Sequence, residues 1–214
     1  MGYFRHLEEH FRNKSFRRSI YISLVLFALG LIMNYFAGTY AVKKESDSVT
    51  DIILSNTRTY DVDDLFVVGT FAMVALIAFL AFRKLNAFPF IVESIALFVM
   101  VRSVFITLTH IGPFPTRIAI DSDVLSRVSF GGDLFFSGHT GLPFLMALIF
   151  WNVPLLRYTF IFISAFFAVI VLLGHLHYSI DVLSAYFITY SIYHIAETFF
   201  QEEHRLFSDG IAKR

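Results

Sequence analysis

Two histidines and one aspartate stand at the ends of long apolar segments of the chain, at positions His139, His177 and Asp181. Ionisable side chains so close to hydrocarbon are energetically costly and tend to serve a function. An imidazole titrates near neutral pH, so it can donate a proton to a departing oxygen or attack phosphorus as a nucleophile. These residue types therefore favour acid–base and nucleophilic chemistry on a phosphate group.

The segment around His139 is typical of the beginning of a helix. Gly131 and Gly132 relax the backbone, Ser137 is a candidate N-cap, and an apolar run follows. A helix start presents unpaired N–H groups and the positive end of the dipole, which together suit a phosphate. We therefore expect Ser137 and Gly138 to bind the phosphate and His139 to exchange the proton.

The second pair, His177 and Asp181, has a spacing of four residues. If Asp181 lies on a helix that starts near Ser179, its carboxylate can reach back to one imidazole nitrogen. That contact would fix the tautomer and leave the other nitrogen as a nucleophile, and the resulting phosphohistidine needs no metal. His175 and His177 could form a metal pair instead, but no cysteine or obvious third ligand accompanies them. We therefore predict neither a metal nor another cofactor.

Together the two segments resemble the signature motifs of the sphingomyelin synthase family, G-D-x3-S-G-H-T and H-Y-[ST]-x-D-V-x2-A-Y-x2-T. The matching positions are Gly132, Asp133, Ser137, Gly138, His139, Thr140, His177, Tyr178, Ser179, Asp181, Val182, Ala185, Tyr186 and Thr189. This family is a branch of the type 2 phosphatidic acid phosphatase superfamily. The resemblance implies His177 as nucleophile, Asp181 as its orienting carboxylate and His139 as general acid and base. It also adds Asp133 and Tyr178 to the substrate-binding residues, although Asp133 alone suits a helix or loop cap.

Two further polar side chains extend the predicted substrate site. Arg102 precedes His110, the outer end of an apolar stretch, by about 12 Å of helix rise. A charge at that depth needs an anionic partner, and Arg102 resembles the arginine of another family motif, so we expect a phosphate or carboxylate beside it. His110 is expected to assist proton transfer or to lie at the membrane interface.

The composition places these groups in a membrane. Of the 214 residues, 57% are hydrophobic and 16% are charged, which is too apolar for an ordinary soluble domain. Basic and acidic side chains balance at 17 each, which argues against nucleic acid as a partner. We expect an integral membrane protein whose partners are membrane lipids.

Spanning a hydrocarbon core takes about 20 helical residues. Several stretches approach that length, which predicts an all-α bundle of six transmembrane helices. They are residues 20–40, 65–82, 88–110, 137–152, 158–176 and 180–200. We expect a catalytic membrane domain over 19–200, a cytoplasmic or interfacial amphipathic segment over 1–18 and a cytoplasmic tail over 201–214.

The distribution of Lys and Arg predicts the orientation. Most of these residues lie in the two tails, in the turn at Arg83 and Lys84, and at Arg157. Cytoplasmic segments carry the excess of positive charge, so both termini are predicted to be cytoplasmic. The three reactive side chains then all fall on the non-cytoplasmic face.

These expectations define a lipid phosphotransferase that moves a phospho-headgroup from a phospholipid to a lipid alcohol such as ceramide or diacylglycerol. The absence of the K-x6-R-P motif of the wider superfamily favours this headgroup chemistry. A phosphatase that uses water as the acceptor is the alternative, because the small size of the chain and the missing P-L-P-D motif of the synthases leave hydrolysis open. A transporter or scaffold, with polar residues that line a pathway, is a third reading from a different class.

Overall fold

The structure is a computed structural model in which residues 14–120 and 135–212 are described. Over these ranges the chain forms helices joined by turns and loops, without strands, which confirms the all-α prediction. The long helices are α2 (Lys14–Lys43), α3 (Asp63–Arg83), α4 (Phe88–Leu108), α6 (Gly138–Ile149), α7 (Pro154–Leu173), α8 (Ser179–Phe199) and α9 (Gln201–Ala212). Two short 3₁₀ turns are η1 (Leu54–Asn56) and η2 (Leu85–Ala87).

Four of the described helices are long and apolar enough to cross a membrane: α2, α3, the combined η2 and α4 segment Leu85–Leu108, and α7. The helix α6 is apolar but has only 12 residues. The helix α8 has 21 residues but is less apolar, because ionisable side chains such as Asp181 and His194 interrupt it. Of the predicted six spans, these four have the required length and composition, and those at α6 and α8 stay predictions.

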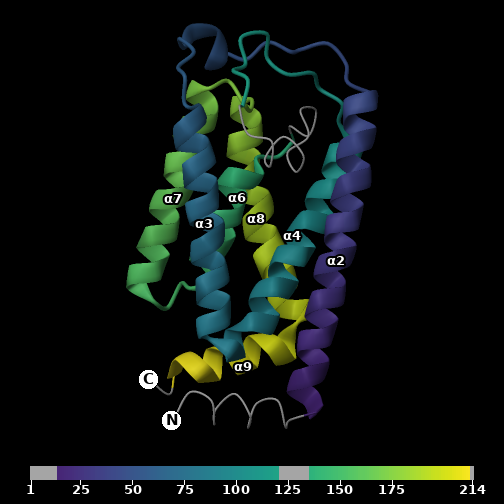
Figure 1. Ribbon diagram of the computed structural model, residues 1–214, viewed down its shortest axis with the longest axis vertical. Helices are drawn as coiled ribbons and strands as arrows, with labels where there is room; N and C mark the ends of the chain where they lie inside the picture. Colours follow the sequence, from purple (N-terminus) through teal and green to yellow (C-terminus); the bar gives the residue numbers. More distant parts are fainter. Residues whose placement is uncertain (1–13, 121–134, 213–214) are drawn as a thin grey trace.

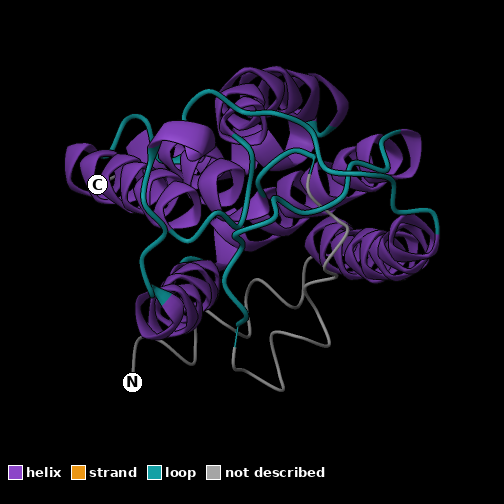
Figure 2. Ribbon diagram, turned by 90° about the horizontal axis from the view of Figure 1, so that it is seen from above, coloured by secondary structure: helices purple, strands orange, loops and turns teal. Residues whose placement is uncertain are grey.

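The long helices stand side by side, and α9 lies across one end of them (Figure 1). Phe207 of α9 is buried there, with its ring 5.9 Å from Phe90 and 5.6 Å from Phe150. The predicted tail over 201–214 is therefore helical through Ala212 and packs on the bundle. At the opposite end, long loops cross over the helices (Figure 2).

The short helix α6 lies at the centre, in contact with α7, α8 and α4. Its residues Leu145, Met146 and Ala147 are fully buried. Gly141 makes close packing possible, because a Cβ atom there would lie 2.8 Å from Thr189 Oγ1 and 2.9 Å from the Phe98 ring. The start of α6 is thereby held at a fixed distance from α8.

Candidate active site

The two motif segments meet at the starts of α6 and α8. The backbone N–H of Ser137 donates a hydrogen bond of 3.1 Å to the backbone oxygen of Asp181. Ser137 also caps α6, since its hydroxyl oxygen accepts a hydrogen bond from the Thr140 N–H at 3.4 Å. The predicted N-cap is confirmed, and residues far apart in the sequence form one cluster.

His177 and Asp181 face each other across the first turn of α8. His177 Nδ1 lies 3.5 Å from Asp181 Oδ2, and both side chains are buried. Asp181 Oδ2 also accepts a hydrogen bond of 2.9 Å from the Tyr178 N–H, whereas Asp181 Oδ1 and His177 Nδ1 have no hydrogen-bond partner among the described residues. A small approach of the ring would form the Nδ1–H···O bond and leave Nε2 as the nitrogen turned away from the carboxylate.

His139 lies in the first turn of α6 between aromatic rings of α3 and α7. The centroid of its imidazole is 4.4 Å from the Phe66 ring and 5.5 Å from the Phe167 ring. The side chain is half-buried and lies within electrostatic range of both His177 and Arg102. The imidazole of His139 therefore interacts electrostatically with both of these side chains.

Arg102 of α4 reaches the start of α6. Its Nε donates a hydrogen bond of 2.9 Å to the backbone oxygen of Phe136. A Cβ atom on Gly138 would lie 3.3 Å from the same Nε, so the absence of a side chain at Gly138 makes room for the guanidinium. A helix start and a cation side by side favour the binding of an anion such as phosphate.

Two predicted substrate-binding residues have contacts elsewhere. The His110 ring packs against Tyr40 of α2 at 5.2 Å, and the His110 backbone oxygen accepts a hydrogen bond from Ser46. Tyr178 is buried, and its hydroxyl donates to the Gly112 oxygen at 2.7 Å. Burial raises the pKa of the Tyr178 phenol, which keeps the hydroxyl protonated for this bond. A contact of either residue with substrate stays a prediction.

Asp133, another predicted substrate-binding residue, lies outside the described residues, and its role stays a prediction.

Sequence reasoning missed Asp51, a buried aspartate in the loop before α3 whose carboxylate accepts two hydrogen bonds from Ser179. The spacing of 128 residues between these partners left no local signal by which the sequence could have revealed the contact.

Within the described ranges, no group of three or more His, Cys, Asp and Glu side chains is arranged to hold a metal ion. His175, the other half of the possible metal pair, has its Nδ1 within 2.5 Å of the Thr116 hydroxyl and 3.2 Å of the Thr59 hydroxyl. Its contacts are those of a buried structural histidine.

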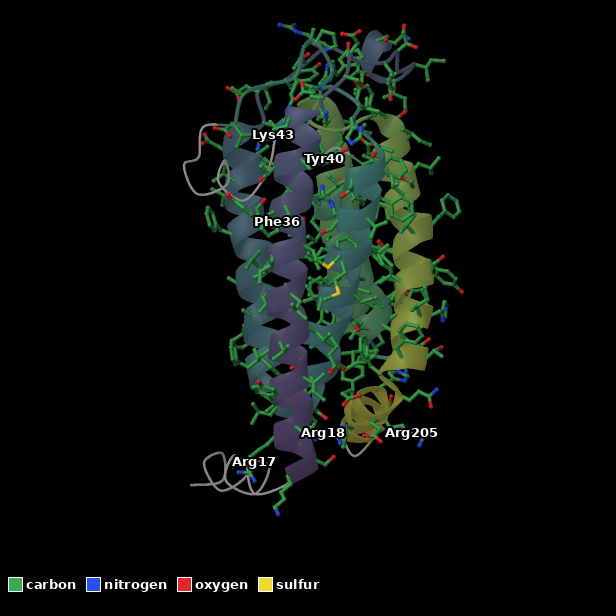
Figure 3. All side chains as sticks on the ribbon, turned by 90° about the vertical axis from the view of Figure 1, so that its right-hand side faces the viewer. Arg17, Arg18, Phe36, Tyr40, Lys43 and Arg205 are labelled. Atoms are coloured by element: carbon green, nitrogen blue, oxygen red, sulfur yellow. The ribbon has the colours of Figure 1, made fainter. Side chains whose placement is uncertain are left out.

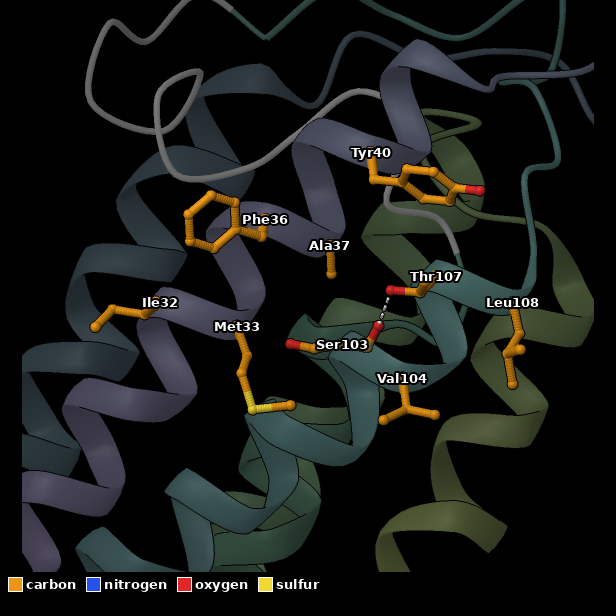
Figure 4. A pocket seen from close by; sticks show the side chains of 9 residues that line it. All are labelled: Ile32, Met33, Phe36, Ala37, Tyr40, Ser103, Val104, Thr107 and Leu108. Carbon is orange, nitrogen blue, oxygen red and sulfur yellow. Dashed lines mark hydrogen bonds between the residues drawn. The ribbon is translucent and has the colours of Figure 1, made fainter.

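A separate apolar groove of about 460 Å³ lies between α2 and α4 (Figure 4). Its lining is Ile32, Met33, Phe36, Ala37 and Tyr40 from α2 and Ser103, Val104, Thr107 and Leu108 from α4. The hydroxyls of Ser103 and Thr107 donate to carbonyls of their own helix, at 2.8 Å each, so these two side chains leave the groove apolar. Figure 3 shows Phe36, Tyr40 and Lys43 one above another along α2.

Residues 131–198 match the protein-family model described as PAP2 superfamily C-terminal. The matched segment contains α6, α7 and nearly all of α8, and with them His139, His177 and Asp181. No curated protein and no solved structure matches the chain. The match supports the superfamily but does not assign the chain to its sphingomyelin synthase branch. The part of the chain that carries the reactive side chains is similar to the type 2 phosphatidic acid phosphatase superfamily, whose members are phosphatases and phosphotransferases.

Proposed function

We propose that this protein is a membrane-embedded phosphotransferase that moves a phospho-headgroup between lipids through a phosphohistidine on His177. The observation that carries the proposal is the cluster of His177, Asp181, His139 and Arg102 around the start of α6. It combines a nucleophile, an orienting carboxylate, an acid–base group and an anion-binding cation. The family match over the same segment supports phosphate chemistry on lipids.

The start of α6 and Arg102 would hold the phosphate. Arg102 lies against Gly138, the first residue of α6, and a helix start presents N–H groups that suit a phosphate. Charge that develops on the phosphate oxygens in the transition state would be stabilised by both. This arrangement would give Arg102, the one arginine of α4, an anionic partner.

His177 Nε2 would attack phosphorus, and the bond from phosphorus to the lipid alcohol would break. Asp181 lies 3.5 Å from the opposite ring nitrogen, and a hydrogen bond between them would fix the tautomer needed for attack. His139 would give its proton to the departing lipid oxygen and thereby become neutral. The headgroup phosphate then remains bound to His177 through a nitrogen–phosphorus bond.

In the second step, an acceptor hydroxyl would give its proton to neutral His139 and attack the phosphorus. The nitrogen–phosphorus bond breaks, His177 is restored and the acceptor carries the phospho-headgroup. If the acceptor is a lipid alcohol such as ceramide or diacylglycerol, the protein is a transferase of the sphingomyelin synthase type. If the acceptor is water and the donor is a lipid phosphomonoester, the protein is a phosphatase, which is the second candidate; the family match supports phosphatases and phosphotransferases alike.

The remaining helices would place this chemistry at one side of the membrane. We propose six spans, with α6 and α8 completing the bundle, and cytoplasmic termini. The start of α2 and the helix α9 lie at the same end of the bundle (Figure 1), and the basic residues of both tails support a cytoplasmic location for that end. The catalytic cluster near the loop-covered end would then open to the non-cytoplasmic leaflet.

The test is an assay of purified protein in nanodiscs that contain a headgroup-labelled phospholipid, with and without ceramide or diacylglycerol. A transferase yields a labelled new lipid, and a phosphatase yields labelled water-soluble phosphate or phospho-headgroup. His139→Ala and His177→Ala should reduce turnover by several orders of magnitude, and Asp181→Asn somewhat less. His194→Ala, an exposed histidine on the same helix α8, is the matched control and should retain activity.

A parent protein without phosphate turnover on any of these lipids would contradict the proposal and favour the transporter or scaffold. Acid-labile, alkali-stable label on the parent but not on His177→Ala would support the covalent step. Label on the His177→Ala protein would place the nucleophile elsewhere.

A further inference from the structure

Asp51, in the loop between α2 and α3, places its carboxylate at the start of α8. Asp51 Oδ2 accepts hydrogen bonds from the Ser179 N–H and from the Ser179 hydroxyl, each at 2.7 Å. Ser179 is the first residue of α8 and stands midway between His177 and Asp181. A helix start usually takes its cap from the residue just before it, and here a distant loop supplies the carboxylate.

Asp51 is itself held firmly. Its Oδ1 accepts hydrogen bonds from the N–H groups of Ile53 at 2.8 Å and Leu54 at 3.0 Å, and the side chain is buried. Burial alone would raise the pKa of Asp51, but the hydrogen bonds from Leu54, Ser179 and Ile53 outweigh burial and hold the pKa below its ordinary value. The carboxylate is therefore ionised and has one orientation, with its two oxygens committed to two different segments.

Tyr178 and Ser179, which follow His177, form hydrogen bonds with several segments of the chain. The Tyr178 N–H is bound by Asp181 from within the helix, and the Tyr178 hydroxyl is bound by the Gly112 oxygen from the loop after α4. The Ser179 N–H is bound by Asp51 from the loop after α2. Because His177 directly precedes these residues, their positions determine where its imidazole stands relative to Asp181.

From these contacts we infer that Asp51 is a positioning residue for the His177–Asp181 pair, acting through Ser179 at the start of α8. The inference rests on the proposed function, since it assigns Asp51 to the same site. Asp51 does not take part in the chemical steps proposed above. Its contribution is to keep the first turn of α8 in the geometry in which Asp181 can orient the nucleophile.

The decisive variant is Asp51→Asn, which keeps the shape of the side chain but replaces one acceptor oxygen by an amide group that donates. It can no longer satisfy both Ser179 and the loop N–H groups. We expect kcat to fall about 10- to 100-fold, as for other residues that orient a reacting group, with KM within about twofold of the parent. The rate of label transfer to His177 should fall by the same factor as kcat.

Asp47→Asn is the matched control, because Asp47 is an exposed aspartate of the same loop. Its kcat and KM should equal those of the parent. Ser179→Ala removes the hydroxyl contact but keeps the N–H contact, so its kcat should lie between the parent and Asp51→Asn. This variant also serves if Asp51→Asn fails to fold, because the loop keeps all of its own contacts with Asp51.

A merely structural anchor would lower the melting temperature and leave the kcat of the folded fraction unchanged. If Asp51→Asn and Ser179→Ala retain the parental kcat per folded molecule while His177→Ala is inactive, the inference is wrong and the proposed function stands. If the parent has no phosphate turnover, the proposed function fails first, and the positioning role fails with it. A loss of kcat in Asp47→Asn equal to that in Asp51→Asn would also overturn the inference, because the effect would then belong to the loop as a whole.

Discussion

The contact between α6 and α8 at Gly141 allows a sharp test of how the two motif segments are held together. In Gly141→Ala, the new Cβ would lie 2.8 Å from Thr189 Oγ1 and 2.9 Å from the Phe98 ring, both in the packed interior. An ordinary contact begins near 3.4 Å. The atoms around the new Cβ must therefore move by about 0.6 Å, the difference between 2.8 and 3.4 Å. Because Thr189 and Phe98 lie in the packed interior, we expect part of this movement to separate α6 from α8.

The expected effect on stability is modest. Overpacking a buried site costs about 1–3 kcal/mol. Alanine in a helix is preferred over glycine by about 1 kcal/mol, which offsets part of that. A net loss of about 0–2 kcal/mol remains, and chemical unfolding in detergent would measure it.

The expected effect on activity is larger. Gly141 lies one turn from the start of α6, so the separation displaces His139 relative to His177 and Asp181 on α8. A misplacement of 1 Å can reduce the rate about 100-fold, so a shift of about 0.6 Å should lower kcat about tenfold. The assay is the headgroup transfer described above, with kcat expressed per folded molecule.

Gly30→Ala is the matched control. Its Cβ would lie 3.3 Å from the Ala96 backbone oxygen at the contact of α2 with α4, away from α6 and α8. It should leave kcat unchanged. Full parental kcat in Gly141→Ala, at an unfolding free energy equal to that of the parent, would refute the reasoning that this contact sets the distance between the motif segments.

Two further predictions concern charges at the same end of the bundle. Arg102→Ala should lower kcat/KM about 10²- to 10³-fold. The kcat/KM of Arg102→Lys should lie between those of Arg102→Ala and the parent, because lysine keeps the charge but not the planar guanidinium. Equal kcat/KM for the parent and Arg102→Ala would show that Arg102 does not bind the anion. The pKa of Asp51 is lowered from an ordinary value of 3.8, so its ionised form contributes stability that is complete above about pH 4 and is lost as the pH falls through the lowered pKa of the folded protein. The difference in melting temperature between the parent and Asp51→Asn should therefore be largest above pH 4 and shrink below it, and a difference that grows on acidification would contradict this assignment.

Local patterns in the sequence predicted the parts of the site that depend on neighbouring residues. The N-cap at Ser137 and the helix start near Ser179 are confirmed, because capping is decided within a few residues of the helix end. The spacing of His177 and Asp181 likewise predicted their approach, since a side chain in the first turn of a helix that starts near Ser179 can reach back to the residue just before it. These features need no knowledge of the tertiary fold.

The contacts that join distant segments could not be predicted in this way. Arg102 was expected beside a phosphate or carboxylate, and the structure gives it a hydrogen bond to the backbone oxygen of Phe136. The capping of Ser179 by Asp51 depends on how a long polar loop folds back over the bundle. The span predicted to begin at residue 158 starts at Pro154, because proline is favoured in the first turn of a helix and apolar content alone does not mark that position.

The groove between α2 and α4 is a place where lipid of the surrounding bilayer would contact the protein. The groove is open at the surface of the bundle, and apolar side chains that line it, such as Ile32, Phe36 and Leu108, are exposed. In a membrane, the hydrocarbon of the acyl chains would contact these side chains and fill the groove. We therefore expect the packing of α2 against α4 to depend on the acyl chains or detergent tails that contact this groove, and to differ between preparations in different amphiphiles.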